Sequence, residues 1–212
     1  MMDFWSALLS TFNGALIEAT ALTAWEAVAV TLAAAYLILA MKGSIWCWFA
    51  AFASTAIYTA LFWKVSLLME SVLNVYYMAM AFYGLHQWSK GRTDDSGIEV
   101  VSWSLKRHVQ LILGTASVSV IVGFLMSNYT QASYAYLDAA TTCFAVMTTY
   151  LVTKKVLENW LYWVVIDFVS IYLYLQKGLM LTSMLFILYV GMAIAGYFLW
   201  RTAMREQRVA SA

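Results

Sequence analysis

The sequence predicts an all-α integral membrane protein with seven transmembrane helices. Apolar residues make up 64% of the 212 residues and charged residues only 11%, whereas a soluble domain carries roughly 25% charged residues. The apolar residues form continuous runs, which are typical of membrane helices and not of membrane-spanning strands. The basic residues also gather on one side of the membrane that these runs define.

A helix needs about 20 apolar residues to cross the hydrocarbon core of a bilayer. Seven stretches meet this requirement, namely 25–41, 46–64, 68–88, 108–126, 133–152, 159–176 and 179–200. The N-terminal segment 1–24 places its apolar residues on one helical face, so we expect a short helix on the membrane surface, with a frayed terminus as the alternative. Segment 89–107 is expected to be a cytoplasmic linker, and segment 201–212 a cytoplasmic tail.

The basic residues predict the orientation, because cytoplasmic loops carry an excess of Lys and Arg. Only Lys64 and Lys177 fall on the opposite side. The other side holds Lys42, Lys90, Arg92, Lys106, Arg107, Lys154, Lys155, Arg201, Arg205 and Arg208. We therefore expect a protein of the bacterial inner membrane with its N-terminus outside and its C-terminus in the cytoplasm.

The sequence also contains an internal repeat, in which one constant offset aligns three spans of the first half with three of the second. This offset aligns Gly84 with Gly196 and Trp88 with Trp200, and it relates further pairs such as Ser71 and Ser183, Tyr77 and Tyr189, Glu26 and Asp138, and Trp48 and Trp160. The repeats predict two parallel three-helix bundles, 25–88 and 133–200, with a linking helix at 108–126. In this 3+1+3 plan, which SWEET sugar transporters use, the substrate site lies near the midplane between the halves.

The span 159–176 carries the clearest polar face. Its residues follow helical spacing, and they are Asn159, Trp163, Asp167 (or Ile166), Ser170 and Tyr174. An ionised group at the bilayer centre costs about 2.5–3.5 kcal/mol of insertion free energy on insertion scales. We therefore expect Asp167 to have a functional or structural role that offsets this cost. It is expected either to contact the substrate or to hydrogen-bond a neighbouring helix and hold the bundle together.

The other candidate substrate-binding residues are polar or aromatic groups inside the spans. Asn74 offers two donors and an acceptor for a small polar ligand. Asp138 lies at the start of its span, where interaction with the helix dipole is the alternative explanation. The remaining candidates are Tyr77, Thr142, Trp160 and Tyr189.

The tryptophans divide into two groups. Trp160 and Trp163 lie beside polar residues, and an indole ring there could stack on a flat cation with about 2 kcal/mol of stabilisation. Tryptophans at span ends are expected to be interface anchors, and these are Trp25, Trp63, Trp88, Trp103 and Trp200.

Several classes of function are disfavoured. Cys47 and Cys143 lie inside apolar runs, so they are expected to be small core residues. His86 and His108 lack acidic or cysteine neighbours at metal-ligand spacing. We expect no metal, no cofactor and no enzymatic activity, and the absence of a strongly basic face argues against nucleic acid as a partner.

Particular segments resemble a known family. In the second half these segments are LDAATT (137–142), KKVLENWLYW (154–163), YLYLQKGLMLTSMLF (172–186) and GYFLWR (196–201). In the first half they are LNVYY (73–77) and YGLHQW (83–88). Together they are similar to the PnuC family of bacterial nicotinamide riboside transporters. The resemblance covers about residues 25–201. The chain has no proline, which argues against a SWEET protein itself. Asn74 stands where the family is expected to have Gln.

The resemblance implies facilitated uptake of nicotinamide riboside, which a separate cytoplasmic nicotinamide riboside kinase would trap by phosphorylation. Trp163 or Trp160 would stack on the pyridinium ring, and Asn74, Asn159 and Tyr77 would donate or accept hydrogen bonds. Asp138 and Thr142 would lie on the outer approach. The lipid bilayer is the other expected partner, and a homo-oligomer stays open. Thiamine, riboflavin and a proton-coupled vitamin carrier remain the alternatives.

Overall fold

The computed structural model describes residues 24–64, 68–90, 99–130, 134–176 and 180–210, and these residues form seven helices. The helices are α2 (Ala24–Met41), α3 (Cys47–Lys64), α4 (Leu68–Ser89), α5 (Leu105–Tyr129), α6 (Ala135–Thr153), α7 (Asn159–Gln176) and α8 (Met180–Ala210). The expected all-α fold is confirmed. The proposed membrane-surface segment lies, apart from Ala24, outside the described residues, as do residues 91–98 of the linker.

Most helix ends lie within three residues of the predicted span ends. The large difference is α8, which continues to Ala210 and has 31 residues. The apolar pattern ends near residue 200, but nothing in the following residues stops a helix, because they include no proline or glycine and have good helix propensity. The predicted tail is therefore mostly a continuation of α8.

The described helices differ in how clearly they qualify as membrane spans by length and composition. Three of them, α2, α5 and α8, are long and apolar enough to cross a bilayer, and α3 contains the shorter apolar stretch Cys47–Leu61. The outer face of α5 exposes Leu113, Val120 and Ile121, as expected for a surface that contacts acyl chains. Some of the other helices carry polar side chains in the interior of the bundle, and Asp167 on α7 is one of them.

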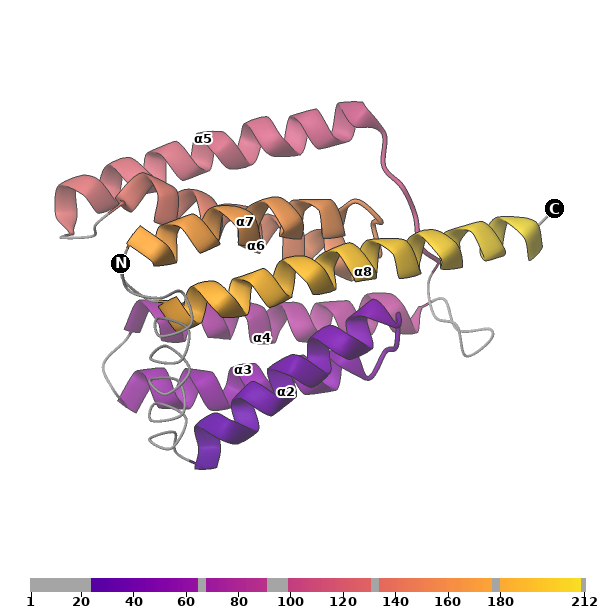
Figure 1. Cartoon of the computed structure of the whole chain (residues 1–212), viewed down its shortest axis with the longest axis horizontal. Coiled ribbons are helices and arrows are strands. Elements are labelled where there is room, and N and C mark those ends of the chain that lie inside the picture. The colour runs from indigo at the N-terminus through magenta and orange to yellow at the C-terminus, as the bar shows by residue number, and fades with distance from the viewer. Residues whose placement is uncertain (1–23, 65–67, 91–98, 131–133, 177–179, 211–212) are drawn as a thin grey trace, which may run out of the picture.

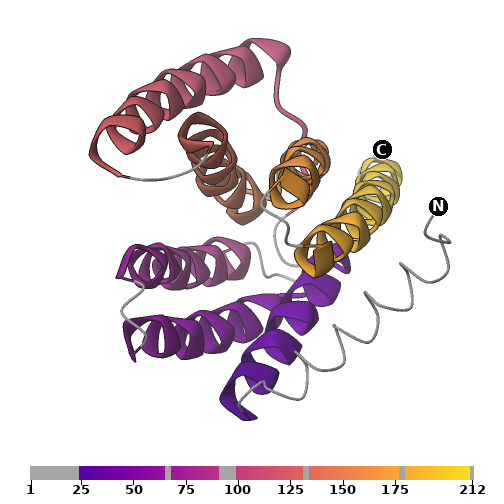
Figure 2. The same cartoon turned by 60° about the vertical axis from the view of Figure 1, so that its left-hand side comes forward.

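The helices form two groups with one helix outside them. In Figures 1 and 2, α2, α3 and α4 lie together, and α6, α7 and α8 form the second group, against which α5 packs through α6. The two groups meet where α2 packs on α8 and where α4 packs on α6. Each half thus supplies its first and third helix to the contact between the halves.

Several contacts occur twice, at positions that the repeat offset relates. The Ser71 hydroxyl donates to the Thr59 carbonyl oxygen at 3.0 Å, and the Ser183 hydroxyl donates to that of Ile171 at 3.4 Å. Both bonds join the third helix of a half to its second helix. The same local packing therefore recurs in both halves.

The turns after α2 and α6 also match. Gly43 and Lys155 are equivalent positions of the repeat, and both have a left-handed backbone, with φ of 67° and 52°. Their backbone amides donate to Ala40 at 2.9 Å and to Val152 at 3.0 Å, which are again related by the repeat offset. A left-handed backbone is easy for glycine and unfavourable for lysine, so the second turn is the more strained one.

Candidate functional site

A cavity of about 380 Å³ lies between the two halves. Side chains from α2, α4, α6, α7 and α8 line it, which means that both halves contribute. Its lining consists of Ala33, Tyr36, Leu37, Ala40, Leu73, Tyr77, Thr141, Thr142, Ala145, Val152, Trp160, Trp163, Ile166, Asp167, Ser170, Tyr174, Phe186, Tyr189 and Ala193. This volume lies within the range of about 300–1,000 Å³ for small-molecule sites.

One face of α7 provides the only carboxylate of the described lining, together with hydroxyl and aromatic groups. Trp160, Trp163, Asp167, Ser170 and Tyr174 are three or four residues apart and all border the cavity. Four of them, Trp163, Asp167, Ser170 and Tyr174, belong to the polar face that the sequence predicts for the span 159–176, whose first residue, Asn159, does not border the cavity. The helix therefore presents a carboxylate and a hydroxyl between aromatic rings.

Asp167 is the central polar group of the cavity. Its side chain is only 5% exposed, and the lining of the cavity contains no Lys, Arg or His side chain among the described residues. An isolated carboxylate that is withdrawn from water is strongly destabilised unless a partner compensates for the loss of hydration. The position is therefore suited to a ligand that brings a positive charge or a hydrogen-bond donor.

Aromatic rings from α7 and α8 form one wall of the cavity. Tyr174 and Phe186 stack with centroids 5.1 Å apart and planes inclined by 27°, and Phe186 meets Tyr189 edge to face at 5.6 Å. Tyr77 lines the same cavity from the other half. Flat rings at these positions can contact a planar ligand over its face.

The cavity ends at a cluster of four buried tryptophans, Trp48, Trp88, Trp160 and Trp200, which we call the tryptophan floor. Trp48 meets Trp88 edge to face at 5.2 Å, and Trp160 meets Trp200 in the same way at 5.4 Å. Trp88 and Trp200 lie 6.0 Å apart. Each half thus contributes one perpendicular tryptophan pair.

Hydrogen bonds across the halves hold this floor in place. The indole N–H of Trp88 donates to the carbonyl oxygens of Val152 at 3.3 Å and Thr153 at 3.2 Å. The indole N–H of Trp200 donates to the carbonyl oxygen of Ala40 at 3.0 Å. The two links are related by the repeat, since Ala40 corresponds to Val152.

The burial of Trp88 and Trp200 corrects a prediction. Both were expected to be interface anchors, but they are only 1% and 2% exposed, whereas Trp25 and Trp63 are 65% and 66% exposed. A tryptophan at a span end suits either the lipid headgroups or a helix contact, and sequence position does not distinguish these environments. The carbonyl groups at the ends of α2 and α6 provide the acceptors that favour burial here.

Six of the predicted substrate-binding residues border the cavity, namely Tyr77, Thr142, Trp160, Trp163, Asp167 and Tyr189. Three do not. Asn159 is fully buried at the start of α7, where its side-chain amide donates to the Val156 carbonyl oxygen at 2.7 Å. Asn74 is half-buried on α4, and Asp138 lies in the first turn of α6.

Three aromatic residues of the cavity are not among the predicted substrate-binding residues. Tyr36 is on α2, and nothing in its sequence context marks it. Tyr174 could have been chosen, because it is part of the polar face that the sequence predicts for α7. Phe186 occupies the repeat position of Asn74, so it was visible only as a difference between the halves.

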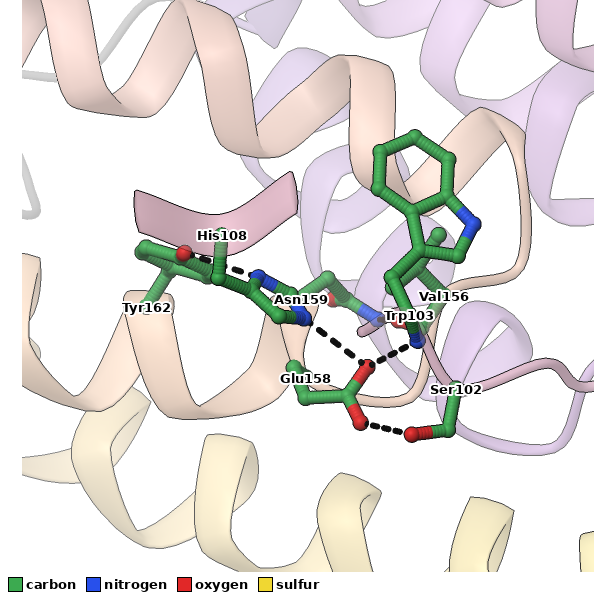
Figure 3. Close-up of polar contacts among 7 residues, drawn as sticks. All are labelled: Ser102, Trp103, His108, Val156, Glu158, Asn159 and Tyr162. Atoms are coloured by element: carbon green, nitrogen blue, oxygen red, sulfur yellow. Dashed lines mark hydrogen bonds and ion pairs between the residues drawn. The ribbon is translucent and has the colours of Figure 1, made fainter. Parts of the chain in front are cut away.

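A second polar cluster lies outside the cavity, at the start of α5 and α7 (Figure 3). The Glu158 carboxylate accepts hydrogen bonds from the Ser102 hydroxyl and, at 3.4 Å, from the backbone N–H of Trp103. It also lies 3.5 Å from Nε2 of His108, whose Nδ1 is 2.9 Å from the Tyr162 hydroxyl. This cluster ties the end of the linker to α7. Within the described ranges, no group of three His, Cys, Asp or Glu side chains is placed to hold a metal ion.

The chain is similar to transporters of known identity. It is 22% identical over 180 residues to the nicotinamide riboside transporter PnuC of Escherichia coli (strain K12), covering 73% of this chain and 75% of the relative. It is 23% identical over 167 residues to the riboflavin/roseoflavin transporter RibM of Streptomyces davaonensis, covering 77% and 78%.

A solved structure and a family model extend this comparison. The crystal structure of the vitamin B3 transporter PnuC matches with a TM-score of 0.70 at 20% identity, over 97% of this chain and 94% of the other, so the two proteins share the fold. The model of the family described as nicotinamide mononucleotide transporter matches residues 23–202. The chain therefore belongs to the nicotinamide mononucleotide transporter family.

Proposed function

We propose that the protein carries nicotinamide riboside across the membrane through the cavity between its two halves. This substrate combines a flat pyridinium cation, a carboxamide and a ribose. The cavity combines aromatic rings with a buried carboxylate and a buried hydroxyl. The PnuC relative, whose name states this substrate, supports the same assignment.

The observation that carries the proposal is the buried carboxylate of Asp167, which lies among aromatic rings. A pyridinium ring would supply the missing positive charge, and the surrounding rings would stabilise the same cation through their π faces. Trp163 lies one turn before Asp167 on the same face of α7, so it is our choice for the stacking residue. Tyr77 and Tyr189 face the cavity from opposite halves and would contact the carboxamide or the ribose.

Riboflavin and thiamine are the alternative substrates. Riboflavin, which the RibM relative carries by name, is neutral and would leave the Asp167 carboxylate without a counter-charge. Thiamine is a flat cation and fits the charge of the cavity equally well. Charge therefore separates riboflavin from the other two, and direct binding has to separate nicotinamide riboside from thiamine.

The proposed orientation in the bacterial inner membrane determines which end of the bundle faces the cytoplasm. Basic residues lie at the C-terminal ends of α2, α6 and α8 and at the start of α5, and these helix ends would face the cytoplasm. Substrate would enter from outside and equilibrate passively without chemical conversion. Phosphorylation by a separate cytoplasmic kinase would then keep it inside.

The deciding experiment is calorimetric titration of the purified protein with nicotinamide riboside, thiamine, riboflavin and a simple sugar. We expect saturable heat with nicotinamide riboside, and none with the sugar. Saturation by thiamine or riboflavin alone would reassign the substrate. Uptake into proteoliposomes should reach the same end point with and without a pH gradient, because accumulation driven by the gradient would instead indicate a proton-coupled carrier.

A further inference from the structure

The tryptophan floor closes one end of the proposed transport path. Ala40, Val152 and Trp160 border the cavity and also belong to the buried cluster beneath it. The indole N–H groups of Trp88 and Trp200 each cross from one half to a carbonyl group of the other half. The halves cannot separate at this end unless both links break.

We propose that the tryptophan floor is the cytoplasmic gate of the carrier, that it is closed in this structure, and that Lys155 biases it toward opening. The proposal rests on the transport function argued above. The gate would open when the ends of α2 and α6 move away from Trp200 and Trp88. Lys155 lies in the turn that follows α6, directly at this boundary.

Lys155 is held in an unfavourable state while the floor is closed. Its side chain is only 4% exposed, and its ammonium group lies 4.6 Å from the centroid of the Trp88 ring. Burial lowers the pKa of Lys155 to about 8, which means that desolvation of the ammonium is only partly compensated. The contact with the indole face recovers some of this loss.

The backbone adds a second strain at the same residue. Lys155 has a φ of 52° where its repeat counterpart is Gly43, and a left-handed backbone is costly for a residue with a side chain. The linker holds this turn in place, because the Val101 amide donates to the Lys155 carbonyl oxygen at 3.0 Å and the Leu157 amide donates to that of Val101 at 2.8 Å. If the turn moved and the ammonium became hydrated, both strains would be released.

Cys47 provides a native reporter for opening. It is fully buried within the same cluster, and it becomes the only thiol when Cys143 is replaced by Ser, since the chain has two cysteines. In this Cys143→Ser background, purified protein in lipid nanodiscs would be treated with a charged maleimide. The labelling rate of Cys47 then measures how often the floor opens.

Matched tryptophan variants test the gate. Trp88→Phe and Trp200→Phe each remove a bond between the halves and keep an aromatic ring. Trp48→Phe is the control, because the Trp48 indole N–H is buried and lacks a partner among the described residues. We expect Cys47 labelling to rise about fivefold in Trp88→Phe and Trp200→Phe, the effect of losing one net hydrogen bond. Trp48→Phe reduces the buried ring volume but removes no bond between the halves, so labelling should rise less in this variant. Equal rates in all three variants would overturn the gate.

Substitutions of Lys155 test its role. Lys155→Met removes the charge, and Lys155→Gly removes the charge and the backbone strain together. We expect labelling to be slower than in the parent for Lys155→Met and slowest for Lys155→Gly. Faster labelling in both variants would mean that the contact with Trp88 holds the gate closed, and this would overturn the bias assigned to Lys155.

The failure of the gate and the failure of the transport function give different results. If the tryptophan variants do not fold, the gate can still be tested in the Cys143→Ser parent. Nicotinamide riboside uptake and Cys47 labelling are then followed in the same proteoliposomes. If nicotinamide riboside is taken up but Cys47 is labelled no faster during uptake than without substrate, the gate would be refuted and the transport function would stand. An effect of Trp88→Phe on labelling in a protein that transports no nicotinamide riboside would support the gate and refute the substrate.

Discussion

The indole ring of Trp160 lies directly against the backbone of Gly196. A β-carbon placed on Gly196 would approach the ring atoms to 2.7 Å, and one on Gly84 would approach the ring of Trp48 to 2.4 Å. These distances are too short for any real carbon contact, so each of these two tryptophans requires a glycine on the third helix of its half. The requirement occurs in both halves, because Gly84 and Gly196 are equivalent positions of the repeat.

Gly196→Ala should therefore destabilise the protein. Forcing a methyl group into a packed contact costs about 1–3 kcal/mol, and the displaced Trp160 ring would also change the substrate cavity. Thermal unfolding in detergent should show a lower midpoint for Gly196→Ala. The control is Gly191→Ala on the same helix, where no atom lies within 4 Å of the added carbon. That variant should be neutral or more stable, because alanine favours helix over glycine by about 1 kcal/mol.

Asp167→Asn should weaken the binding of a cationic ligand more than that of a neutral one. We expect at least a tenfold loss of affinity for nicotinamide riboside and a much smaller change for its reduced, uncharged dihydro form, because only the former uses the carboxylate charge. Calorimetry with both ligands measures the difference. Asp138→Asn is the matched control, since Asp138 does not border the cavity. Equal losses for the two ligands would contradict a role in recognising charge.

Lys155 should make stability rise with pH above about 8. Burial lowers its pKa to about 8 from 10.5, so between these values the unfolded chain binds more protons than the folded protein, and raising the pH favours the folded state. The Cys47 thiol also interacts with this ammonium. The midpoint of thermal unfolding, measured from pH 7 to pH 10, should therefore rise in the parent relative to Lys155→Met. Parallel curves for the two proteins would show that Lys155 ionises as it does in water.

Glu158→Gln should loosen the attachment of the linker to α7. The carboxylate accepts from Ser102 and from the Trp103 backbone and lies beside His108, and hydrogen bonds to a charged group contribute about 1.5–3 kcal/mol each before solvent screening. Hydrogen exchange of the Val101 and Leu157 amides, which bond across the linker and the α6–α7 turn, should become faster. Glu206→Gln, on the exposed surface of α8, should leave both amides unchanged.

The helices and the α7 face could be predicted from the sequence because both depend on local periodicity. Asp167, Trp163 and Trp160 follow the helical repeat, and the structure brings all three to the cavity. The inward position of Tyr36 could not be predicted, since it depends on how α2 is rotated against α8. The same is true of Trp88 and Trp200, whose acceptors lie on helices distant in the sequence.

Asn159 shows a different limit. It shares the polar face of α7, but it is the first residue of that helix, and its amide bonds to the turn before it. A helical pattern predicts which side of the helix a side chain lies on, but it does not predict whether the side chain is level with the cavity along the bundle axis. Polar residues at the end of a span therefore need a structure before they can be assigned to a ligand or to the fold.

The length of α8 turns small changes near the cavity into larger ones outside the membrane. Gln207 accepts a hydrogen bond from the Val100 amide at 3.1 Å, and it lies about 21 Å along the helix axis from Ala193 at the cavity, at about 1.5 Å per residue. A tilt of α8 by about 5° around Ala193 would displace Gln207 by about 2 Å, which a hydrogen bond does not tolerate. The helix thus acts as a lever arm, and each tilt has to pull the linker along or release it.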